Sequence, residues 1–518
     1  MNELLKKILG KVFYAIFCLI FVAVVVELFF SQQVLNISNS VREAIFAGKG
    51  KEYAGMNVLR VAYPDGPVTL EPTVADPVTR QRLDNIYEAL VKADRDLNIR
   101  PSLAVSFGLI DNYTWEFKLR SGVKFHDGSA LDVEDVKASF DRAMSYPGSE
   151  LTGLLSTIKD LQIEDDLNFK IITSDPDPLL LQRLSMILIV PSEYRDRKME
   201  TPVGTGSYEF DSWDVGKKIT LKSFDGYWGE KSKFEKVEMY SVADKFDRVD
   251  MLINGDADLL AFVPYDGVDY VKENGFNIVS VPSLEVQFLL FNMRSNRLMS
   301  NIKNREFVSF SVNQKSLIDA IGGYARSVSQ FVGSGIFGFS PYIPDHVYDF
   351  DAAAELAKET GLVGKTVQFH LGQGLTVLGD YLREKLGEMG VNVVVSYLNE
   401  SDLLKSMESG KADIYFLGFK SGIGDSSSFL SFIPYSDGPY NYLGYKNEYV
   451  DKLIKGSLME MNFFSRQNDL QEAMKIIVEE DVIGVPLFEY EVVYAFNDKV
   501  IINPRIDGII YFDELIVN

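Results

Sequence analysis

The sequence predicts an α/β protein of more than one domain, and three observations support this prediction. The chain has 518 residues, which is more than one hydrophobic core usually holds. Residues 349–420 alternate between helical and extended patterns, as is typical of strand–helix–strand units around a parallel sheet. Residues 115–144 predict a strand, a turn and a capped helix.

The segment 115–144 has the clearest local pattern. Trp115, Phe117 and Leu119 alternate with charged residues, as in a strand with one buried face. A helix is expected to begin at Asp132, because its carboxylate can accept the free N–H groups of the first turn. Asp135 then stands at the third helical position, where it can complete a capping box.

Apolar spacing and helix-ending glycines locate the other elements that matter here. The expected helices are 351–360, 375–389, 403–409 and 466–481. The expected strands are 58–63, 287–291, 366–371, 391–395 and 414–417.

Composition excludes several classes of protein. The chain is 46% hydrophobic and 24% charged, which is typical of a folded protein. Its net charge of -22 argues against nucleic acid or an anionic membrane surface as the main partner. The single cysteine, Cys18, excludes an intramolecular disulfide. The three histidines lack the spacing of metal ligands, so no metal site is predicted.

The N-terminus predicts a membrane anchor. Residues 12–30 are apolar except for Glu27, and this length fits one transmembrane helix. The lysines of residues 1–11 place that end in the cytoplasm and the body of the protein outside. A cleaved signal peptide is the alternative, but its apolar run is usually shorter and ends at a small-residue site that is missing here. Residues 31–56 would form a tether.

No pattern in the chain predicts catalysis or a cofactor. The motifs GxSxG, HExxH and the P-loop are absent. Residues 333–338 fit GxGxxG, but no strand precedes them and no helix follows, so a dinucleotide site is rejected. His126 and Asp127 lie in a tight turn, where a structural role is expected. The sequence therefore predicts a protein that is not an enzyme, with no catalytic residues.

The run Arg120–Gly128, together with Asp135, Val136 and Ser139, resembles the signature of extracytoplasmic solute-binding proteins of family 5. These are the peptide- and nickel-type receptors of ABC importers. The resemblance extends from residue 57 to the C-terminus. Other segments that match the family in the same order are Leu70–Pro72, Pro202–Tyr208, Phe224–Gly229, Leu252–Asp258 and Asn441–Asp451.

The resemblance implies a two-lobed periplasmic-binding-protein fold (type II, cluster C) with an extra small α+β domain inserted in the first lobe. Hinge strands near 284–290 and 483–487 would join the lobes, and hinge closure would bury the solute. The implied segments are 57–76, 190–285 and 480–518 for lobe I, 77–189 for the inserted domain and 286–479 for lobe II.

The loop after strand 414–417 is expected to bind the ligand. In peptide-binding relatives an aspartate of this loop pairs with the α-ammonium group of the peptide. Here Gly422 takes its place and Phe419 replaces a tryptophan, while Asp425 matches a second acidic position. Recognition of a free peptide N-terminus would therefore require Asp425 to provide the carboxylate. The expected ligand contacts are Phe419, Ser421, Gly422 and Asp425, with Asn292, Tyr440 and Tyr63 as further candidates.

Phe419 also fits the role of an ordinary core aromatic residue. For the whole protein, the resemblance implies a monomeric, membrane-anchored receptor outside the cytoplasm that captures an oligopeptide or similar small solute and presents it to ABC permease subunits. The alternative is an anchored surface sensor or adhesion protein that retains the fold without taking part in import.

Overall fold

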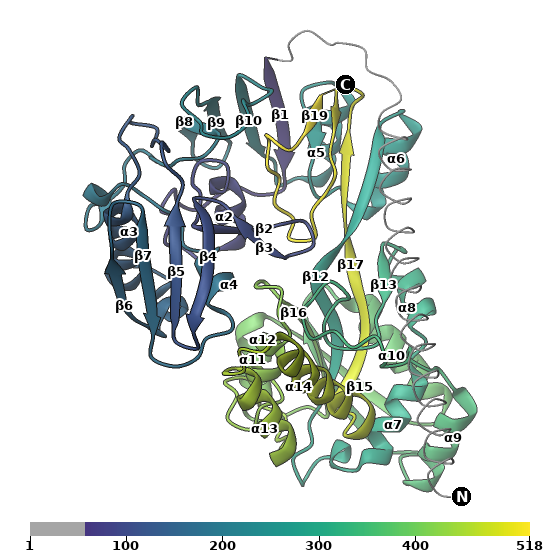
Figure 1. Ribbon diagram of the computed structural model, residues 1–518. Helices are drawn as coiled ribbons and strands as arrows, with labels where there is room; N and C mark the ends of the chain where they lie inside the picture. The colour runs from purple at the N-terminus through teal and green to yellow at the C-terminus, as the bar shows by residue number, and fades with distance from the viewer. Residues whose placement is uncertain (1–56, 518) are drawn as a thin grey trace, which may run out of the picture. The chain divides into compact units, whose positions relative to one another are not determined.

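The computed structural model describes residues 57–517 (Figure 1). Two long antiparallel strands, β12 (Asn277–Phe291) and β17 (Gly484–Phe496), lie at the centre of an 11-stranded sheet. β17 reaches the first lobe through its last residues, which pair with β11. β12 reaches the second lobe through its second half, which pairs with β16. The same two strands therefore belong to both lobes.

The first lobe contains the end of the sheet formed by β11, β1, β10, β9 and β8. Its strand β1 (Val58–Tyr63) lies parallel to both of its neighbours, β10 and β11. Leu59, Val61 and Tyr63 pack into one core, and Ala62 packs into a second core with α5 on the opposite face. The remaining elements are β8 (Tyr208–Asp214), β9 (Lys218–Ser223), β10 (Lys236–Ser241), α5 (Lys245–Ile253), β11 (Leu259–Leu260), α6 (Val268–Glu273), β18 (Val500–Ile501) and β19 (Ile516–Val517).

The chain between β1 and β8, called the insert below (residues 64–207), has a core and a sheet of its own. Helix α3 (Val133–Ser145) covers one face of a four-stranded antiparallel sheet in the order β4-β5-β7-β6. The predicted capping box of α3 is confirmed, because Asp132 and Asp135 each accept a backbone N–H of the other. The other elements are α2 (Pro77–Leu83), β2 (Val91–Ala93), β3 (Ile99–Pro101), β4 (Ala104–Asp111), β5 (Thr114–Leu119), β6 (Ile158–Ile163), β7 (Asn168–Thr173) and α4 (Leu180–Leu184).

The second lobe is the chain between β12 and β17. Its central strand, β14 (Thr366–Gly372), lies parallel to β15 (Asn392–Leu398) and β16 (Ile414–Lys420), as the alternating pattern predicts. Successive side chains of β12 point to opposite faces, so Leu289 and Phe291 enter one core and Phe288 and Leu290 the other. The helices are α7 (Ile302–Ser311), α8 (Gln314–Ala320), α9 (Phe350–Glu359), α10 (Thr376–Glu388), α11 (Glu400–Glu408), α12 (Ser427–Phe432), α13 (Glu448–Ser457) and α14 (Phe463–Lys475), and β13 (Ala325–Ser327) pairs with β17.

The predicted elements are found with shifts at their ends. The largest is at the strand expected over 287–291, which begins ten residues earlier as β12 (Asn277–Phe291). The helix expected at 466–481 also differs. Helix α14 begins three residues earlier, because the side chain of Asn462 accepts the N–H of Ser465 and caps it. It ends at Lys475 and continues as a π-helical turn over Ile476–Glu480. Apolar spacing shows the buried face of a helix but does not show this change of winding.

No helix within residues 57–517 is both long and apolar enough to cross a membrane. The segments predicted as a cytoplasmic N-terminus (1–11), a transmembrane anchor (12–30) and a tether (31–56) lie outside the described residues.

Candidate ligand-binding site

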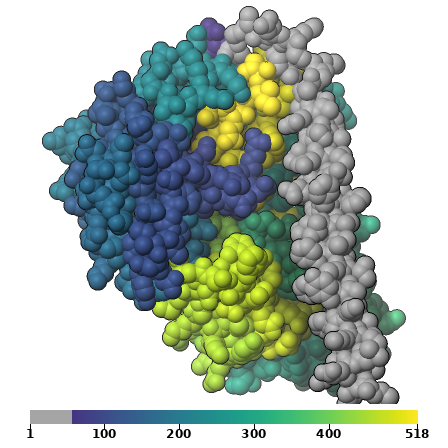
Figure 2. Space-filling model, viewed as in Figure 1, coloured from purple at the N-terminus to yellow at the C-terminus, as the bar shows by residue number. Residues whose placement is uncertain are grey.

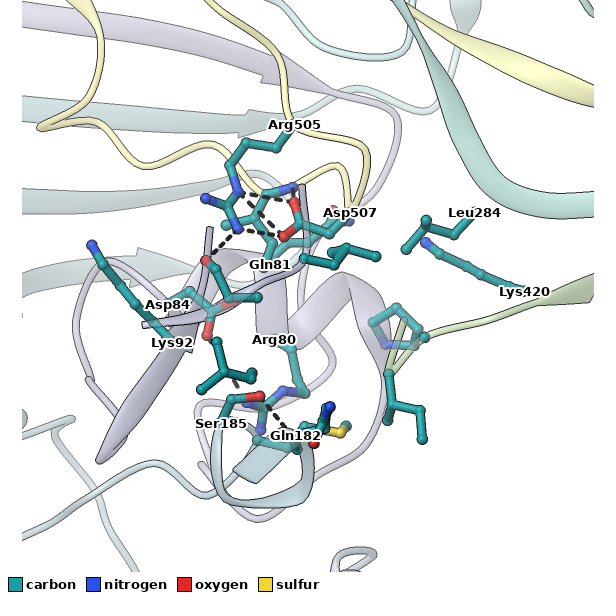
Figure 3. Close-up of a pocket in the computed structure, with 18 of the residues that line it drawn as sticks. Arg80, Gln81, Asp84, Lys92, Gln182, Ser185, Leu284, Lys420, Arg505 and Asp507 are labelled. Atoms are coloured by element: carbon teal, nitrogen blue, oxygen red, sulfur yellow. Dashed lines mark hydrogen bonds and ion pairs between the residues drawn. The ribbon is translucent and has the colours of Figure 1, made fainter. Parts of the chain in front are cut away.

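A cavity of about 310 Å³ lies between the two lobes. The second lobe contributes Lys420, the last residue of β16, and Gly422 and Ile423, which follow it. β12 contributes Leu284. The insert and the C-terminal segment 505–511 form the opposite wall (Figure 3). Figure 2 shows the surfaces of the insert, in blue, and of the second lobe, in yellow-green, next to each other. The family resemblance implies that a solute is buried where the lobes close on each other, and this cavity lies between the lobes.

A contact between the lobes lies at the edge of this cavity. Leu97, at the tip of the β2–β3 hairpin, packs so closely on Gly424 that a Cβ atom there would come within 2.9 Å of it. Leu97 itself has a φ of 63°, in the left-handed region that leucine rarely adopts. The turn is held by Asp94, whose carboxylate accepts the N–H of Asp96 and that of Asn98. The hairpin thus presents an apolar tip to the second lobe.

Helix α2 places two charged side chains in the cavity wall. Asp76 caps the helix by accepting the N–H of Thr79, and Pro77 occupies its first turn. Arg80 and Asp84 then lie one turn apart, with Arg80 Nη2 4.0 Å from Asp84 Oδ1. Burial raises the pKa of Asp84 to about 6, although the nearby Arg80 lowers it. The Nη1 atom of Arg80 is buried and has no hydrogen-bond partner among the described residues.

The C-terminal segment contributes a closed ion pair. Arg505 Nη2 lies 2.6 Å from Asp507 Oδ2 and also donates to the backbone carbonyl groups of Ala93 and Asp94. These bonds attach the segment to the β2–β3 hairpin. Both charges are therefore engaged within the protein, so the pair adds polarity to the wall without adding net charge.

Two lysines at the cavity have no carboxylate within hydrogen-bond distance among the described residues. Lys92 Nζ lies 4.0 Å from Glu514 and 5.4 Å from the centre of the Tyr511 ring. Lys420 stands opposite Glu285 across the β12–β16 pair. The Glu285 carboxylate instead accepts the amide N–H of Gln287 at 2.6 Å. None of the ion pairs within residues 57–517 includes Lys420.

The predicted contacts in the loop after β16 have different surroundings. Gly422 lines the cavity and its neighbour Ser421 is buried, with its N–H bonded to the carbonyl of Leu284. Phe419 is half-buried outside the cavity lining and packs edge-on against Phe429 at 5.5 Å, which is the core role named as its alternative. Contact of these three residues with a solute stays a prediction.

Asp425 requires a correction of the expected role. Its side chain is 0% exposed, and its two oxygens accept bonds from Arg466 Nη1 at 2.7 Å and Nη2 at 2.9 Å. It also caps the turn into α12 by accepting the N–H of Ser427. Because its oxygens are occupied, Asp425 cannot replace the ammonium-binding aspartate that is missing at Gly422 in this arrangement.

The three further candidates are not gathered at the cavity. Asn292 is fully buried and donates from its amide to the carbonyl groups of Gly410 and Ala412. Tyr63 is buried beneath Arg82, whose guanidinium carbon lies 3.4 Å from its ring centre. Both therefore have structural partners. Tyr440 is 47% exposed, and its ring lies 6.0 Å from that of Phe432.

The signature segment lies in the insert and is not part of the cavity. His126 Nδ1 accepts the N–H of Gly204, and its Nε2–H donates to the carbonyl of Gly206 at 3.1 Å. A glycine N–H can only donate, so the ring is neutral and protonated at Nε2. Burial lowers the pKa of His126 to about 4. The predicted structural role of this histidine is confirmed: it joins the signature to the glycine turn 202–208.

Comparison with known proteins agrees with this architecture. The family model for bacterial extracellular solute-binding proteins, family 5 Middle, matches residues 98–441. The glutathione-binding proteins GsiB of Shigella dysenteriae and Escherichia coli K12 are each 26% identical over 464 residues, covering 84% of this chain and 90% of the relative.

Among solved structures, the ABC transporter substrate-binding protein CtaP of Listeria monocytogenes has a TM-score of 0.81 at 21% identity and covers 89% of this chain and 99% of its own. The periplasmic binding protein DppA of Helicobacter pylori, in complex with the peptide STSA, has a TM-score of 0.71 at 24% identity, covering 89% and 98%. At these identities the likeness shows the fold.

Proposed function

Because the chain belongs to family 5 of the bacterial extracellular solute-binding proteins, we propose that it captures a short peptide or similar small organic solute between its lobes and delivers it to an ABC importer. Members of this family are solute receptors and not enzymes, and they act outside the cytoplasm. The observation that carries the proposal is the cavity, whose walls come from both lobes and the insert.

Capture would proceed by hinge closure about β12 and β17. The pairing of these strands shifts register between Pro282 and Val286 and again at Gln287–Phe288, where the chain passes from one lobe to the other. Such irregularities increase local twist and interrupt the ladder, which suits a hinge. The contact of Leu97 with Gly424 supports closure, because it joins the lobes at the edge of the cavity.

The size of the cavity supports a small solute. About 310 Å³ is at the lower end of the range for ligand pockets. The relatives named as glutathione-binding proteins take a tripeptide-sized molecule, and a solute of that order fits the proposal. Gly422, which lines the cavity, would provide a contact from the second lobe. Phe419 and Ser421 lie outside that lining, and their contact with a solute is proposed from the sequence alone.

The remaining parts of the proposal concern the cell. Residues 12–30 would anchor the receptor in the membrane, because the apolar run has the length of a transmembrane helix. The receptor would act as a monomer. The permease would recognise its closed form, with the solute inside. Loss of solute uptake on deletion of the gene would separate this role from that of a surface sensor or adhesion protein.

Binding can be tested on the purified full-length chain. Dipeptides, tripeptides, glutathione and nickel chelates would be screened by thermal shift, and those that bind would be examined by small-angle scattering. We expect at least one class to raise the melting temperature and to reduce the radius of gyration. No response to any of these classes would contradict the proposal.

A matched pair of variants tests the place of binding. Gly422→Trp should abolish the response without unfolding the protein, because no atom lies within 4 Å of a Cβ built there and the new ring would fill the cavity. Gly153→Trp, at an equally open position in the insert outside the cavity lining, should leave the response unchanged. Retention of binding by Gly422→Trp would place the solute elsewhere.

A further inference from the structure

The cavity carries a local excess of positive charge in a strongly acidic protein. Its lining contains the cations Arg80, Lys92, Lys420 and Arg505 but only two carboxylates, Asp84 and Asp507. The chain as a whole has a net charge of -22. Arg505 and Asp507 neutralise each other in their 2.6 Å ion pair. Lys92 is paired at 4.0 Å with Glu514, which lies outside the lining. Arg80 and Lys420 therefore remain against the single carboxylate of Asp84, in a chain whose overall charge is strongly negative.

Arg80 is the cation with the clearest vacancy. The residue is 9% exposed, and its Nη1 atom has no acceptor among the described residues. Its nearest carboxylate, that of Asp84, stands 4.0 Å from Nη2, beyond hydrogen-bond distance. Buried N–H groups of a guanidinium normally have acceptors, and a planar carboxylate matches the fork of an arginine with two parallel bonds. Nη1 is enclosed in this arrangement, but Arg80 lines the cavity, so a small rotation of its guanidinium would let an anionic group of a bound solute supply the missing acceptor.

Lys420 brings a second positive charge to the cavity from the other lobe. It lies on β16 and lines the cavity. Its cross-strand neighbour Glu285 accepts a hydrogen bond from Gln287 and forms no ion pair with Lys420 within the described residues. An anion between Arg80 and Lys420 would interact with the insert and with the second lobe at once. Charge on the solute would then favour the closed state, because the anion would attract residues of both walls of the cavity.

The second-lobe loop offers no free carboxylate that could bind a positively charged group of a solute. Gly422 stands where peptide-binding relatives are expected to carry an ammonium-binding aspartate, and Asp425 is occupied by Arg466. A solute therefore meets cations at the cavity wall and no available carboxylate in that loop.

We propose that the solute of this receptor is anchored by a carboxylate or a comparable anionic group, bound by Arg80 on the insert with Lys420 facing it from the second lobe. This inference rests on the proposed function, and it narrows the solute class to small organic acids, including peptides held by their carboxylate end. The ammonium end of a peptide contributes little to its binding.

Paired solutes test the inference on the purified full-length chain. A panel of dipeptides, tripeptides, glutathione and small dicarboxylic acids would be titrated into the protein by calorimetry. Each compound would be compared with the derivative in which its carboxylates are converted to amides. The free acids that bind are expected to do so at least 10-fold more tightly than their amides. Amides that bind as tightly as their acids would overturn the inference and leave the proposed function intact. Absence of binding in both sets would overturn the two together.

Variants identify the residues. Arg80→Gln should weaken binding of the acids about 10- to 100-fold, the range for loss of hydrogen bonds to a charged group. Arg80→Lys should lose less affinity than Arg80→Gln, because lysine keeps the positive charge but not the paired N–H groups of the guanidinium. Arg383→Gln, which removes the same charge from the exposed face of α10, is the control and should bind as the wild type does. An unchanged affinity in Arg80→Gln would overturn the assignment.

A second site keeps the test decisive if Arg80→Gln does not fold. Lys420 is exposed and has no ion pair among the described residues, so Lys420→Gln should fold normally. We expect it to weaken binding of the acids about 3- to 10-fold and to leave that of the amides unchanged. An equal loss for acids and amides would mean that Lys420 packs against the solute without reading its charge.

Discussion

The signature segment and the loop after β16 both resemble the family, yet they serve different purposes. In the signature segment the polar side chains with clear roles bond within the protein: His126 bonds to the glycine turn 202–208, and Asp132 and Asp135 cap α3. In the loop after β16, Asp425 is fixed by Arg466, whereas Gly422 three residues earlier faces the cavity. The residues that identify the family hold the insert together, and the residue that departs from the family pattern lies where a solute would bind.

This difference shows that similarity to a family and position at the ligand site are separate properties of a segment. Within one loop, Asp425 is fixed by its ion pair with Arg466 of α14, whereas the side-chain position of Gly422 is open. Substitutions in the two segments should therefore separate stability from solute preference.

The largest expected effect is loss of the buried pair. Asp425→Ala leaves the guanidinium of Arg466, which is 4% exposed, without its carboxylate. Removing one partner of a buried ion pair costs about 3–5 kcal/mol in the free energy of unfolding. Urea denaturation would measure this, with the exposed Asp437→Ala as the control. A loss below about 1 kcal/mol would show that the pair is not structural.

The second-largest effect expected is a loss of stability in acid, through His126 of the signature segment. The pKa of His126 falls from 6.5 to about 4 on folding, mainly through burial. Its contribution to stability is therefore complete above pH 6.5 and is lost as the pH falls towards 4, by up to about 3 kcal/mol. Protonation would also place a hydrogen on Nδ1, against the N–H of Gly204.

The effect of His126 must be measured as a difference in stability between two variants, because Glu88 changes the stability with pH in the opposite direction. Burial raises the pKa of Glu88 to about 7, so its contribution is lost as the pH rises from 4.5 through 7. Denaturation of the wild type and of His126→Gln at several pH values isolates the histidine. The difference between them should shrink from pH 7 to pH 4, and a constant difference would contradict the protonation argument.

A smaller effect is expected at the cap of α3. Asp132→Ala removes the acceptor for the N–H groups of Glu134 and Asp135, which should cost about 1 kcal/mol. Chemical denaturation measures it, with the neighbouring exposed Glu134→Ala as the control. Solute affinity should not change, because α3 is not part of the cavity. A change in affinity would mean that the insert transmits strain to the site.

The fold could be predicted largely from sequence because its signals are local. The alternation in 115–119, the cap at Asp132 and the glycine-ended helices after residue 349 each follow from a few neighbouring residues, and all are found. The resemblance supplied the two-lobed arrangement, which local patterns do not contain.

The cavity could be located only in part. The loop after β16 was expected there because it follows a strand, and Gly422 does line the cavity. Arg80 and Lys92 were missed, because they come from a helix and a short hairpin strand of the insert, over 300 residues away in the chain. Asp425 was misassigned because its partner, Arg466, lies 41 residues further on, and no local pattern joins them.

The smallest effect on stability, and the sharpest test of the comparison, is expected at the residue that departs from the family. Gly422→Asp should change the free energy of unfolding by less than about 0.5 kcal/mol, because nothing lies within 4 Å of its Cβ position. The new carboxylate would offer an ammonium partner and would also offset Lys420, which lines the same cavity. Trialanine should therefore gain affinity over N-acetyl-trialanine, and N-blocked acids should lose affinity. Calorimetry of both solutes, with the neutral Gly422→Asn as control, measures this shift. Equal behaviour of the two variants would mean that position 422 does not set solute preference, because charge at that position is all that distinguishes them.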